Sequence, residues 1–328
     1  MGRIRVYLLV WFIFPVPLVV AQQPNITEFS FIPQWVPQAQ FAGFYVAHEK
    51  GFYEKLNLKV NILRGGPDRS SCQFLTEGRA DFATMFLTAG IVKRGNGVKL
   101  INIAQIVQRS ALMLIAKKSS GIHAPEDLQG KKVGLWDDDF RIQPKAFFRK
   151  YNLSVNILPQ SATLNLFLRG GVDAASAMWY NEYHMILNAG LDADELTTFF
   201  LADHGMNSPE DGIYCIEETF RKNPSACCDF VRASIDGWKY AFDNMQEALD
   251  IVMKYVSEAN VPTNKIHQKW MLERMKDLIM PPGEVIPIGT LALESYDQVA
   301  LELKRNGLID KIPAFEGFFV GCMSHVKR

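Results

Sequence analysis

Several features that mark other protein classes are missing from this chain of 328 residues. The 35 basic residues balance the 35 acidic residues and form no run, so no charged surface is expected to attract a nucleic acid. The sequence contains no G-x-S-x-G, H-E-x-x-H or P-loop motif, and its histidines are scattered singly. We therefore predict no nucleic-acid binding, no metal or cofactor site and no catalytic residue.

Cysteine is also scarce, and its spacing excludes two familiar uses. The five cysteines include no C-x-x-C pair and have no regular spacing, so they form neither a disulfide framework nor a zinc site. Two of them are adjacent on a predicted helix, where neighbouring side chains point about 100° apart and pair poorly. Buried free thiols are the expectation, and one disulfide, whose pairing the sequence does not define, is the alternative. The residues are Cys72, Cys215, Cys227, Cys228 and Cys322.

The first 21 residues have the pattern of a secretory signal peptide. Arg3 and Arg5 form a short basic region, and residues 6–20 carry no charge. This apolar stretch contains two prolines and is shorter than the ~20 residues that span a bilayer, which disfavours the alternative of a membrane anchor. We expect residues 1–21 to be removed and the mature protein to be periplasmic or secreted.

An internal repeat is the most informative feature of the sequence. Residues 52–63 and 147–158 are identical at eight of twelve positions, and residues 74–86 and 167–179 share a Phe-Leu start, a Gly, an Asp and a Met. Each copy places apolar patterns of strands and helices in the order of a βαβ unit. Since 328 residues also exceed the roughly 250 to 300 at which one core stops growing, we predict two related α/β lobes.

Short apolar or alternating segments predict the strands of these lobes. Residues 211–216 form one more strand, which we place beside the first strand of the second lobe. The other predicted strands are 29–35, 60–63, 82–86 and 101–106 in the first lobe, and 110–116, 133–136, 155–158 and 174–178 in the second.

The lobes are expected to be joined by two chain crossings, near Gln108 and Pro209. Helices predicted after residue 217 have no strands of their own, so they should pack back onto the first lobe. The first lobe then consists of 24–108 and 213–328, and the second of 109–212. Two crossings permit hinge closure around a ligand held in the cleft between lobes.

Aromatic residues stand at the predicted carboxyl ends of strands, where open α/β sheets bind their ligands. Flat side chains in this place could stack on a planar ring, an arrangement that adds ~0.5 to 1.5 kcal/mol per pair beyond area burial. The alternative is that they cap the hydrophobic core. They are Trp35, Phe86, Trp136, Trp179 and Tyr180.

At this level of detail the sequence resembles a known family. The segments WVPQAQFAGFYVAHEKGFYEK, GGPDRSS, GRADFAT, EDLQGKKVGLW, WYNEY and FRKNPSACCDFVRA are similar to those of bacterial periplasmic proteins that bind thiamine-pyrimidine precursors for an ABC transporter. The resemblance covers about residues 28–310. It implies a two-lobed periplasmic-binding-protein-like fold of type II, each lobe a mostly parallel sheet flanked by helices, with the pyrimidine between the lobes.

The resemblance also implies a set of ligand-binding residues. Glu182 corresponds to the family's carboxylate, which could accept the exocyclic N–H of a 4-aminopyrimidine; a solvated acid at a helix start is the alternative. Glycines bring backbone close to a ligand, although a Gly-Gly-Pro turn without a ligand role is equally common. The predicted ligand-binding residues are Trp35, Gln38, Gly65, Gly66, Pro67, Phe86, Trp136, Trp179, Tyr180, Asn181 and Glu182.

A related enzyme offers a different interpretation. The fungal thiamine-pyrimidine synthase has a similar fold, consumes its own histidine and carries pyridoxal phosphate on a lysine, with a cysteine cluster near the return to the first lobe. Here residues 201–211 contain no cysteine, and residues 82–90, FATMFLTAG, contain neither lysine nor histidine. We therefore expect a binding protein and not an enzyme.

The predicted function is capture of a small planar heterocycle, a formylaminopyrimidine or hydroxymethylpyrimidine type of thiamine precursor, for an ABC importer. The expected partners are the small-molecule ligand and the transporter permease, and the protein is expected to be a monomer. Two alternatives stay open: a sensor that reports to a membrane kinase or cyclase, and a binding protein for riboflavin or a sulfonate.

Overall fold

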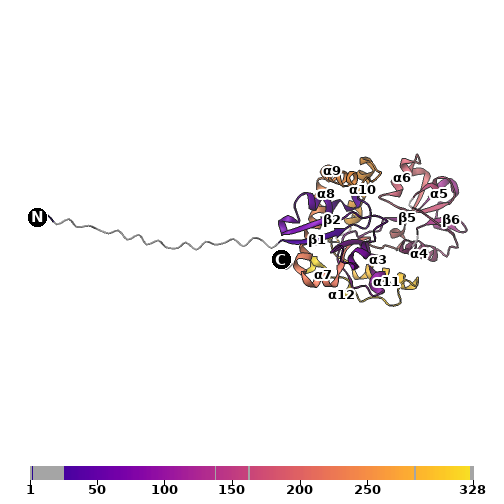
Figure 1. The fold of residues 1–328 in the computed structure, drawn as a ribbon. Helices are drawn as coiled ribbons and strands as arrows, with labels where there is room; N and C mark the ends of the chain where they lie inside the picture. The colour runs from indigo at the N-terminus through magenta and orange to yellow at the C-terminus, as the bar shows by residue number, and fades with distance from the viewer. Residues whose placement is uncertain (1, 3–25, 137, 162, 284–285, 326–328) are drawn as a thin grey trace.

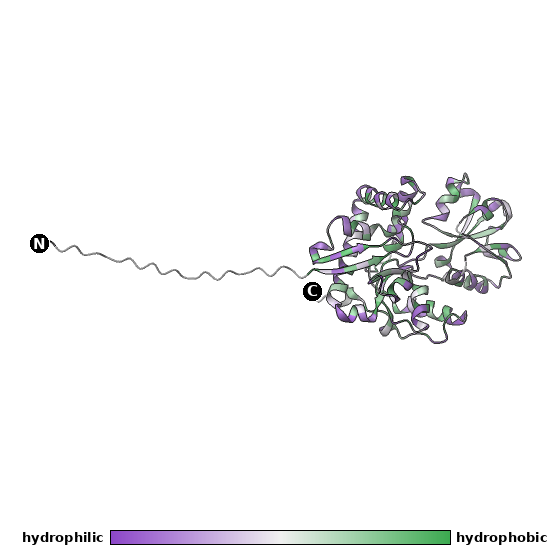
Figure 2. Cartoon of the chain, in the orientation of Figure 1, coloured by the Kyte–Doolittle hydropathy of each residue, from purple (hydrophilic) through white to green (hydrophobic). Residues whose placement is uncertain are grey.

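The computed structural model describes residues 2, 26–136, 138–161, 163–283 and 286–325. The predicted signal peptide lies outside the described residues, apart from Gly2. Two β-sheets, each covered by helices, lie side by side (Figure 1). Apolar residues follow the strands, and hydrophilic residues lie along the outer faces of the helices (Figure 2). This confirms the α/β fold with two mostly parallel sheets. Within the described residues, no helix has the length and apolar character needed to cross a membrane.

The first sheet has five strands in the order β2-β1-β3-β10-β4. β1 pairs in parallel with β2 and β3, whereas β10 is antiparallel to both of its neighbours. We call this sheet and the helices packed on it the first lobe. Its strands are β1 (Thr27–Ile32), β2 (Leu58–Ile62), β3 (Phe82–Phe86), β4 (Leu100–Gln105) and β10 (Asp211–Ile216).

The second sheet repeats this plan in the order β7-β6-β8-β5-β9. β6 pairs in parallel with β7 and β8, and β5 is the antiparallel strand. We call this sheet and its helices the second lobe. Its strands are β5 (Leu112–Lys117), β6 (Lys132–Leu135), β7 (Asn156–Pro159), β8 (Ala174–Met178) and β9 (Leu196–Phe200).

One strand lies in a different sheet from the one predicted. Residues 211–216 pair with β3 and β4 of the first lobe, and not with β5. The strand that does pair beside β5 in the second lobe is β9, which the sequence analysis missed. The antiparallel strand of each sheet therefore follows a chain crossing. β5 follows the first crossing, and β10 follows the second. An apolar pattern predicts that a segment is a strand, but not which sheet it joins.

Helices fill the connections and make up most of the C-terminal third. α8 packs against α1 and also contacts β2 and β4 of the first sheet, and Val231, Ile235, Trp238 and Phe242 are all buried. The helices are α1 (Ala42–Glu49), α2 (Ser71–Thr76), α3 (Leu87–Gly95), α4 (Ile142–Lys150), α5 (Asn165–Leu168), α6 (Glu182–Asn188), α7 (Glu217–Lys222), α8 (Pro224–Asp243), α9 (Met245–Glu258), α10 (Lys265–Ile279), α11 (Leu293–Arg305) and α12 (Phe315–Phe318).

Glycines allow the close approach of α1 and α8. A Cβ added at Gly237 would overlap the carbonyl oxygen of Gly43 and lie 2.8 Å from the Cβ of Ala47. A Cβ at Gly43 would in turn overlap the ring of Trp238. Both helices therefore need glycine at this crossing.

Gly237→Ala should lower the free energy of unfolding by about 2 kcal/mol or more, because the overlap is with backbone and the helices must move apart. At a helical position without neighbouring atoms, the same change would instead raise the free energy of unfolding, because Ala stabilises a helix by ~1 kcal/mol relative to Gly. Denaturant unfolding measures the change. Asp236→Ala, at an exposed position one residue away, is the control and should change stability by less than ~0.5 kcal/mol. Equal stability of Gly237→Ala and wild type would contradict the close packing.

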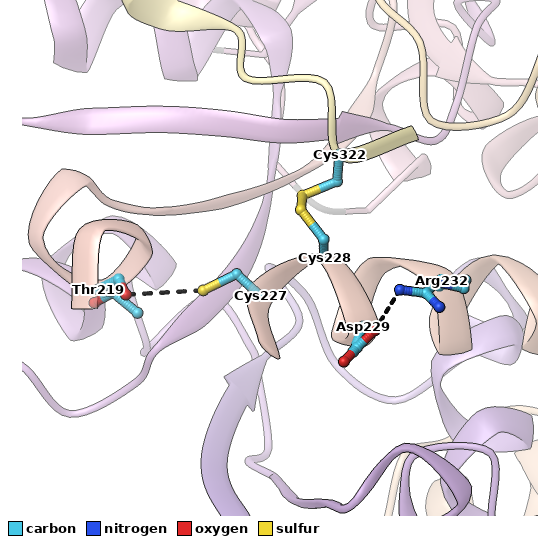
Figure 3. The surroundings of a disulfide bond; sticks show 6 residues. All are labelled: Thr219, Cys227, Cys228, Asp229, Arg232 and Cys322. Carbon is cyan, nitrogen blue, oxygen red and sulfur yellow. Dashed lines mark hydrogen bonds and ion pairs between the residues drawn. A yellow bond between two sulfur atoms is a disulfide. The ribbon is translucent and has the colours of Figure 1, made fainter. Parts of the chain in front are cut away.

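A disulfide joins the C-terminal segment to α8. Cys228 and Cys322, 94 positions apart, are bonded with a Cα–Cα distance of 5.0 Å (Figure 3). Cys72, Cys215 and Cys227 are free and buried. The expectation of free thiols is thus correct for three cysteines and wrong for two. The adjacent Cys227 and Cys228 point in different directions, as the helical geometry predicts (Figure 3).

Candidate ligand-binding site

The two crossings between the lobes lie side by side. The first crossing leaves β4, and the amides of Ile106 and Val107 both donate to the carbonyl oxygen of Asp211, at 3.0 Å each. The amide of Glu210 donates to the carbonyl oxygen of Val107 at 3.2 Å. The second crossing therefore returns to the first lobe directly beside the first, and both end at the edge of the cleft.

A cavity lies between the lobes at this point. Its volume is about 20 Å³, room for about one water molecule. This volume is too small for a heterocyclic ring. The cavity is lined by residues of both lobes and of the second crossing: Phe86, Thr88, Leu112, Phe140, Gln143, Met178, Ser208, Pro209 and Glu210.

Aromatic rings from both lobes meet at the cavity. Phe86, at the end of β3, lies edge-on to Phe140 of the second lobe, with 5.4 Å between ring centroids and 80° between planes. Trp136 lies edge-on to Phe140 at 5.7 Å. Phe86 and Phe140 thus line the cavity from opposite lobes.

Glu210 is the ionisable group of this cavity, and only 4% of the residue is exposed. Its Oε1 accepts from the amide of Ala111 at 2.6 Å and from the hydroxyl of Ser110 at 3.1 Å. Burial, and then the charge of the neighbouring Asp211, raise the pKa of Glu210 to about 8. Its carboxyl group therefore keeps a proton near neutral pH and can both donate and accept a hydrogen bond.

Asp211 adds a second buried carboxyl group directly after Glu210. Its oxygens accept from the side-chain amides of Gln34 and Gln40, the latter at 2.9 Å, and the amide of Gln38 donates to Gln40 at 2.6 Å. Burial raises the pKa of Asp211 to about 7, although both hydrogen bonds oppose this shift. Among the described residues that line the cavity, none is a lysine or arginine. The site thus offers hydrogen bonds to an N–H donor and no positive charge to an anion.

Glu182 is not the solvated acid of the alternative interpretation, because only 8% of it is exposed. One carboxylate oxygen accepts from the amide of Met178 at 2.9 Å, and the other accepts from the side chain of Asn181 at 2.7 Å. Burial raises the pKa of Glu182, and these hydrogen bonds oppose the rise. Both oxygens are therefore engaged by the protein.

The predicted aromatic residues are divided between several environments. Phe86 lines the cavity. Trp136 donates its indole N–H to the carbonyl of Ser161, and Tyr180 is buried. The guanidinium of Arg274 lies 4.8 Å from the ring centroid of Trp179. These other aromatic residues do not line the cavity in the present arrangement of the lobes.

The predicted glycine turn follows β2 and packs against the loop after β1, which carries Trp35. A Cβ at Gly65 would overlap the carbonyl oxygens of Pro33 and Trp35, and Gly66 has a φ of +153°, which L side chains rarely adopt. Pro67 follows directly. Trp35 is 38% exposed on this loop. The two glycines thus have a demonstrable backbone role, and a ligand contact in this loop stays a prediction.

The sequence analysis missed Glu210, Phe140 and Gln143 as site residues. Phe140 lies in the segment after β6, at a strand end of the kind where open α/β sheets bind their ligands, and Glu210 lies directly before β10. Two consecutive acids before an apolar strand were the available signal at Glu210. Neither of these sequence signals showed that the second crossing would bury the carboxyl group of Glu210. No cluster of three or more His, Cys, Asp or Glu suited to a metal occurs in the part of the chain that the structure describes.

The chain belongs to the NMT1/THI5-like family, which it matches over residues 38–248. It is 22% identical over 294 residues to the formylaminopyrimidine-binding protein of Halalkalibacterium halodurans, with 87% of each chain covered. It is 23% identical over 262 residues to the riboflavin-binding protein RibY of Chloroflexus aurantiacus, covering 77% of this chain and 73% of that one. The family resemblance is thereby confirmed. Other relatives are named 4-amino-5-hydroxymethyl-2-methylpyrimidine phosphate synthase.

Solved structures confirm the fold. The periplasmic aliphatic sulphonate binding protein SsuA of Escherichia coli superimposes with a TM-score of 0.66 at 15% identity, covering 90% of this chain and 91% of that one. At this identity the likeness concerns the fold alone. The architecture is that of periplasmic solute-binding proteins with two lobes and a cleft.

Proposed function

We propose that this chain is an exported solute-binding protein that captures a thiamine pyrimidine precursor and delivers it to the permease of an ABC importer. The precursor is of the formylaminopyrimidine or hydroxymethylpyrimidine type. The observation that carries the proposal is the carboxyl group of Glu210, buried at an interlobe cavity with aromatic and apolar walls. The names of two relatives, a formylaminopyrimidine-binding protein and a thiamine biosynthesis protein, support the same ligand class.

A 4-aminopyrimidine complements the hydrogen-bonding groups of this site. It carries an exocyclic N–H donor beside a ring nitrogen acceptor. The Oε2 atom of a protonated Glu210 can donate to the ring nitrogen, because Oε1 already accepts from Ala111 and Ser110. Phe86 and Phe140 supply the faces between which the ring would stack. The other residues predicted from the sequence, Trp35 and Tyr180 among them, stay predictions as ligand contacts.

Anionic ligands are disfavoured at this site. A sulfonate is negatively charged at every ordinary pH, and its burial beside Glu210 and Asp211 would be unfavourable without a compensating cation. The lining residues of the described cavity supply none. Riboflavin is planar and uncharged, so charge does not distinguish it from a pyrimidine at this site. The distinguishing property is the larger size of its three-ring system.

We also propose that the bound molecule leaves unchanged. Relatives with synthase names keep the enzymatic alternative in view. In this chain residues 82–90 form β3 and the start of α3 and contain no lysine or histidine for cofactor attachment or sacrifice. Export through the predicted signal peptide and function as a monomer complete the proposal.

Calorimetric titration of the mature protein tests it. Hydroxymethylpyrimidine or formylaminopyrimidine should bind at least a hundredfold more tightly than riboflavin or an alkanesulfonate. Mass spectrometry should recover ligand and protein with unchanged masses after incubation with pyridoxal phosphate. Preference for the sulfonate, or a loss of mass from a histidine, would overturn the proposal.

Glu210→Ala should weaken pyrimidine binding by ten- to a hundredfold, because it leaves polar groups of the ring unpaired, whereas the amide of Glu210→Gln supplies a donor and an acceptor and should preserve most of the affinity. Glu294→Ala, at an exposed position on α11, is the matched control and should bind as wild type. Wild-type affinity in Glu210→Ala would remove this residue from the site.

A further inference from the structure

A second junction between the lobes lies outside the cavity, where α6 of the second lobe meets α10 of the first. The Nδ1 atoms of His184 on α6 and His267 on α10 lie 2.9 Å apart. The Nε2 atom of His267 lies 2.9 Å from the Oδ1 atom of Asn181. Both imidazoles are buried, with 9% and 8% of the residues exposed. Two hydrogen bonds thus cross between the lobes through one histidine.

The direction of these hydrogen bonds follows from Glu182. Its carboxylate accepts from Asn181 through Nδ2, so the Oδ1 atom of Asn181 faces His267. Since Oδ1 can only accept, Nε2–H of His267 donates to it, and the Nδ1 of a neutral His267 must then accept. The donor to that Nδ1 is Nδ1–H of His184. The Nδ2 atom of Asn188 lies 3.3 Å from the Nδ1 atom of His184; with Nδ1–H of His184 donating to His267, the Asn188 amide would turn its oxygen to this position instead.

Rings on both helices reinforce this junction. The imidazole of His184 stacks on the indole of Trp270, with 4.9 Å between centroids and 8° between planes. The indole N–H of Trp270 donates to the carbonyl of Trp179 in the second lobe at 3.1 Å. The contact between α6 and α10 is therefore buried and includes both ring stacking and directional hydrogen bonds.

We propose that the chain Glu182–Asn181–His267–His184 is a latch that holds the two lobes closed. Glu182 and Asn181 are its positioning residues, since they orient the acceptor that His267 meets across the cleft. Opening of the lobes would break both crossing hydrogen bonds and expose both imidazoles. The ion pair of Arg149 and Glu302, which also joins the lobes, is exposed, and such pairs contribute little.

Small-angle scattering of the mature protein without ligand tests the latch independently of the ligand proposed above. His267→Phe and His184→Phe keep the ring bulk and remove the nitrogens. Each should shift the closed–open equilibrium about tenfold toward the open form and enlarge the radius of gyration. The double variant should shift it no further than His267→Phe, because His184→Phe removes one of the two crossing hydrogen bonds and His267→Phe already removes both. His123→Phe, at an exposed site in the second lobe, is the control and should scatter as wild type.

Asn181→Ala provides a second route that leaves both imidazoles intact. It removes the oxygen that accepts from Nε2–H of His267 and should open the lobes. Melting curves identify any variant that fails to fold, and the other variants then decide. Wild-type scattering from the folded variants, or additive shifts in the double variant, would overturn the latch. Failure of a pyrimidine to bind would leave these measurements unaffected.

Discussion

Between pH 5 and pH 8 the stability of wild type should fall relative to that of Glu210→Gln by about 3 kcal/mol. Burial raises the pKa of Glu210 from 4.5 to about 8, so the folded protein binds this proton more tightly than the unfolded chain does. The stabilisation is complete below pH ~4.5 and is lost as the pH rises toward about 8. Asp211, whose pKa burial raises to about 7, changes in the same direction.

Denaturant unfolding of both proteins at several pH values measures this difference. Other groups also change protonation on unfolding in this range. Burial lowers the pKa of His267 to about 4, so the titration of His267 makes stability rise with pH, opposite to the effect of Glu210. His267 is present in both proteins, so its contribution cancels in the comparison, whereas the titration of Asp211 is coupled to that of Glu210 and is part of the difference. A difference between wild type and Glu210→Gln that does not vary with pH would show that this carboxyl group is not buried as described.

Removal of the disulfide should have the larger effect, about 4 kcal/mol of the free energy of unfolding. Cys228 and Cys322 are separated by 94 positions, and closing a loop of this size constrains the unfolded chain strongly. Cys322→Ser should show the loss in oxidising conditions. A disulfide between Cys228 and Cys322 also agrees with the proposed export, because disulfides persist in oxidising compartments.

Chemical reduction removes the disulfide without a substitution and so tests the same effect independently. Reduced wild type should match Cys322→Ser in stability, and the reductant should not destabilise Cys322→Ser further, because Cys72, Cys215 and Cys227 are free thiols. A loss below ~1 kcal/mol by both routes would mean that the bond does not constrain the chain in solution.

The local pattern of the sequence determined most of the secondary structure and the two-lobed plan. β3 and β8 have the predicted bounds, and the repeat correctly implied two sheets of the same kind, because strand and helix periodicities are properties of a few consecutive residues. The family and the fold followed from motifs that extend over most of the chain.

Only the tertiary structure decided which distant segments meet. Residues 211–216 are a strand on their own pattern, yet their place between β3 and β4 depends on the second crossing. Cys228 could have paired with several cysteines, and His184 and His267, 83 positions apart, were single histidines until α6 and α10 came together. Burial of Glu210 and Glu182 likewise arises from packing between elements. A residue's own neighbours in sequence set its backbone preferences, whereas its partners, its solvation and hence its pKa are set by residues that only folding brings near.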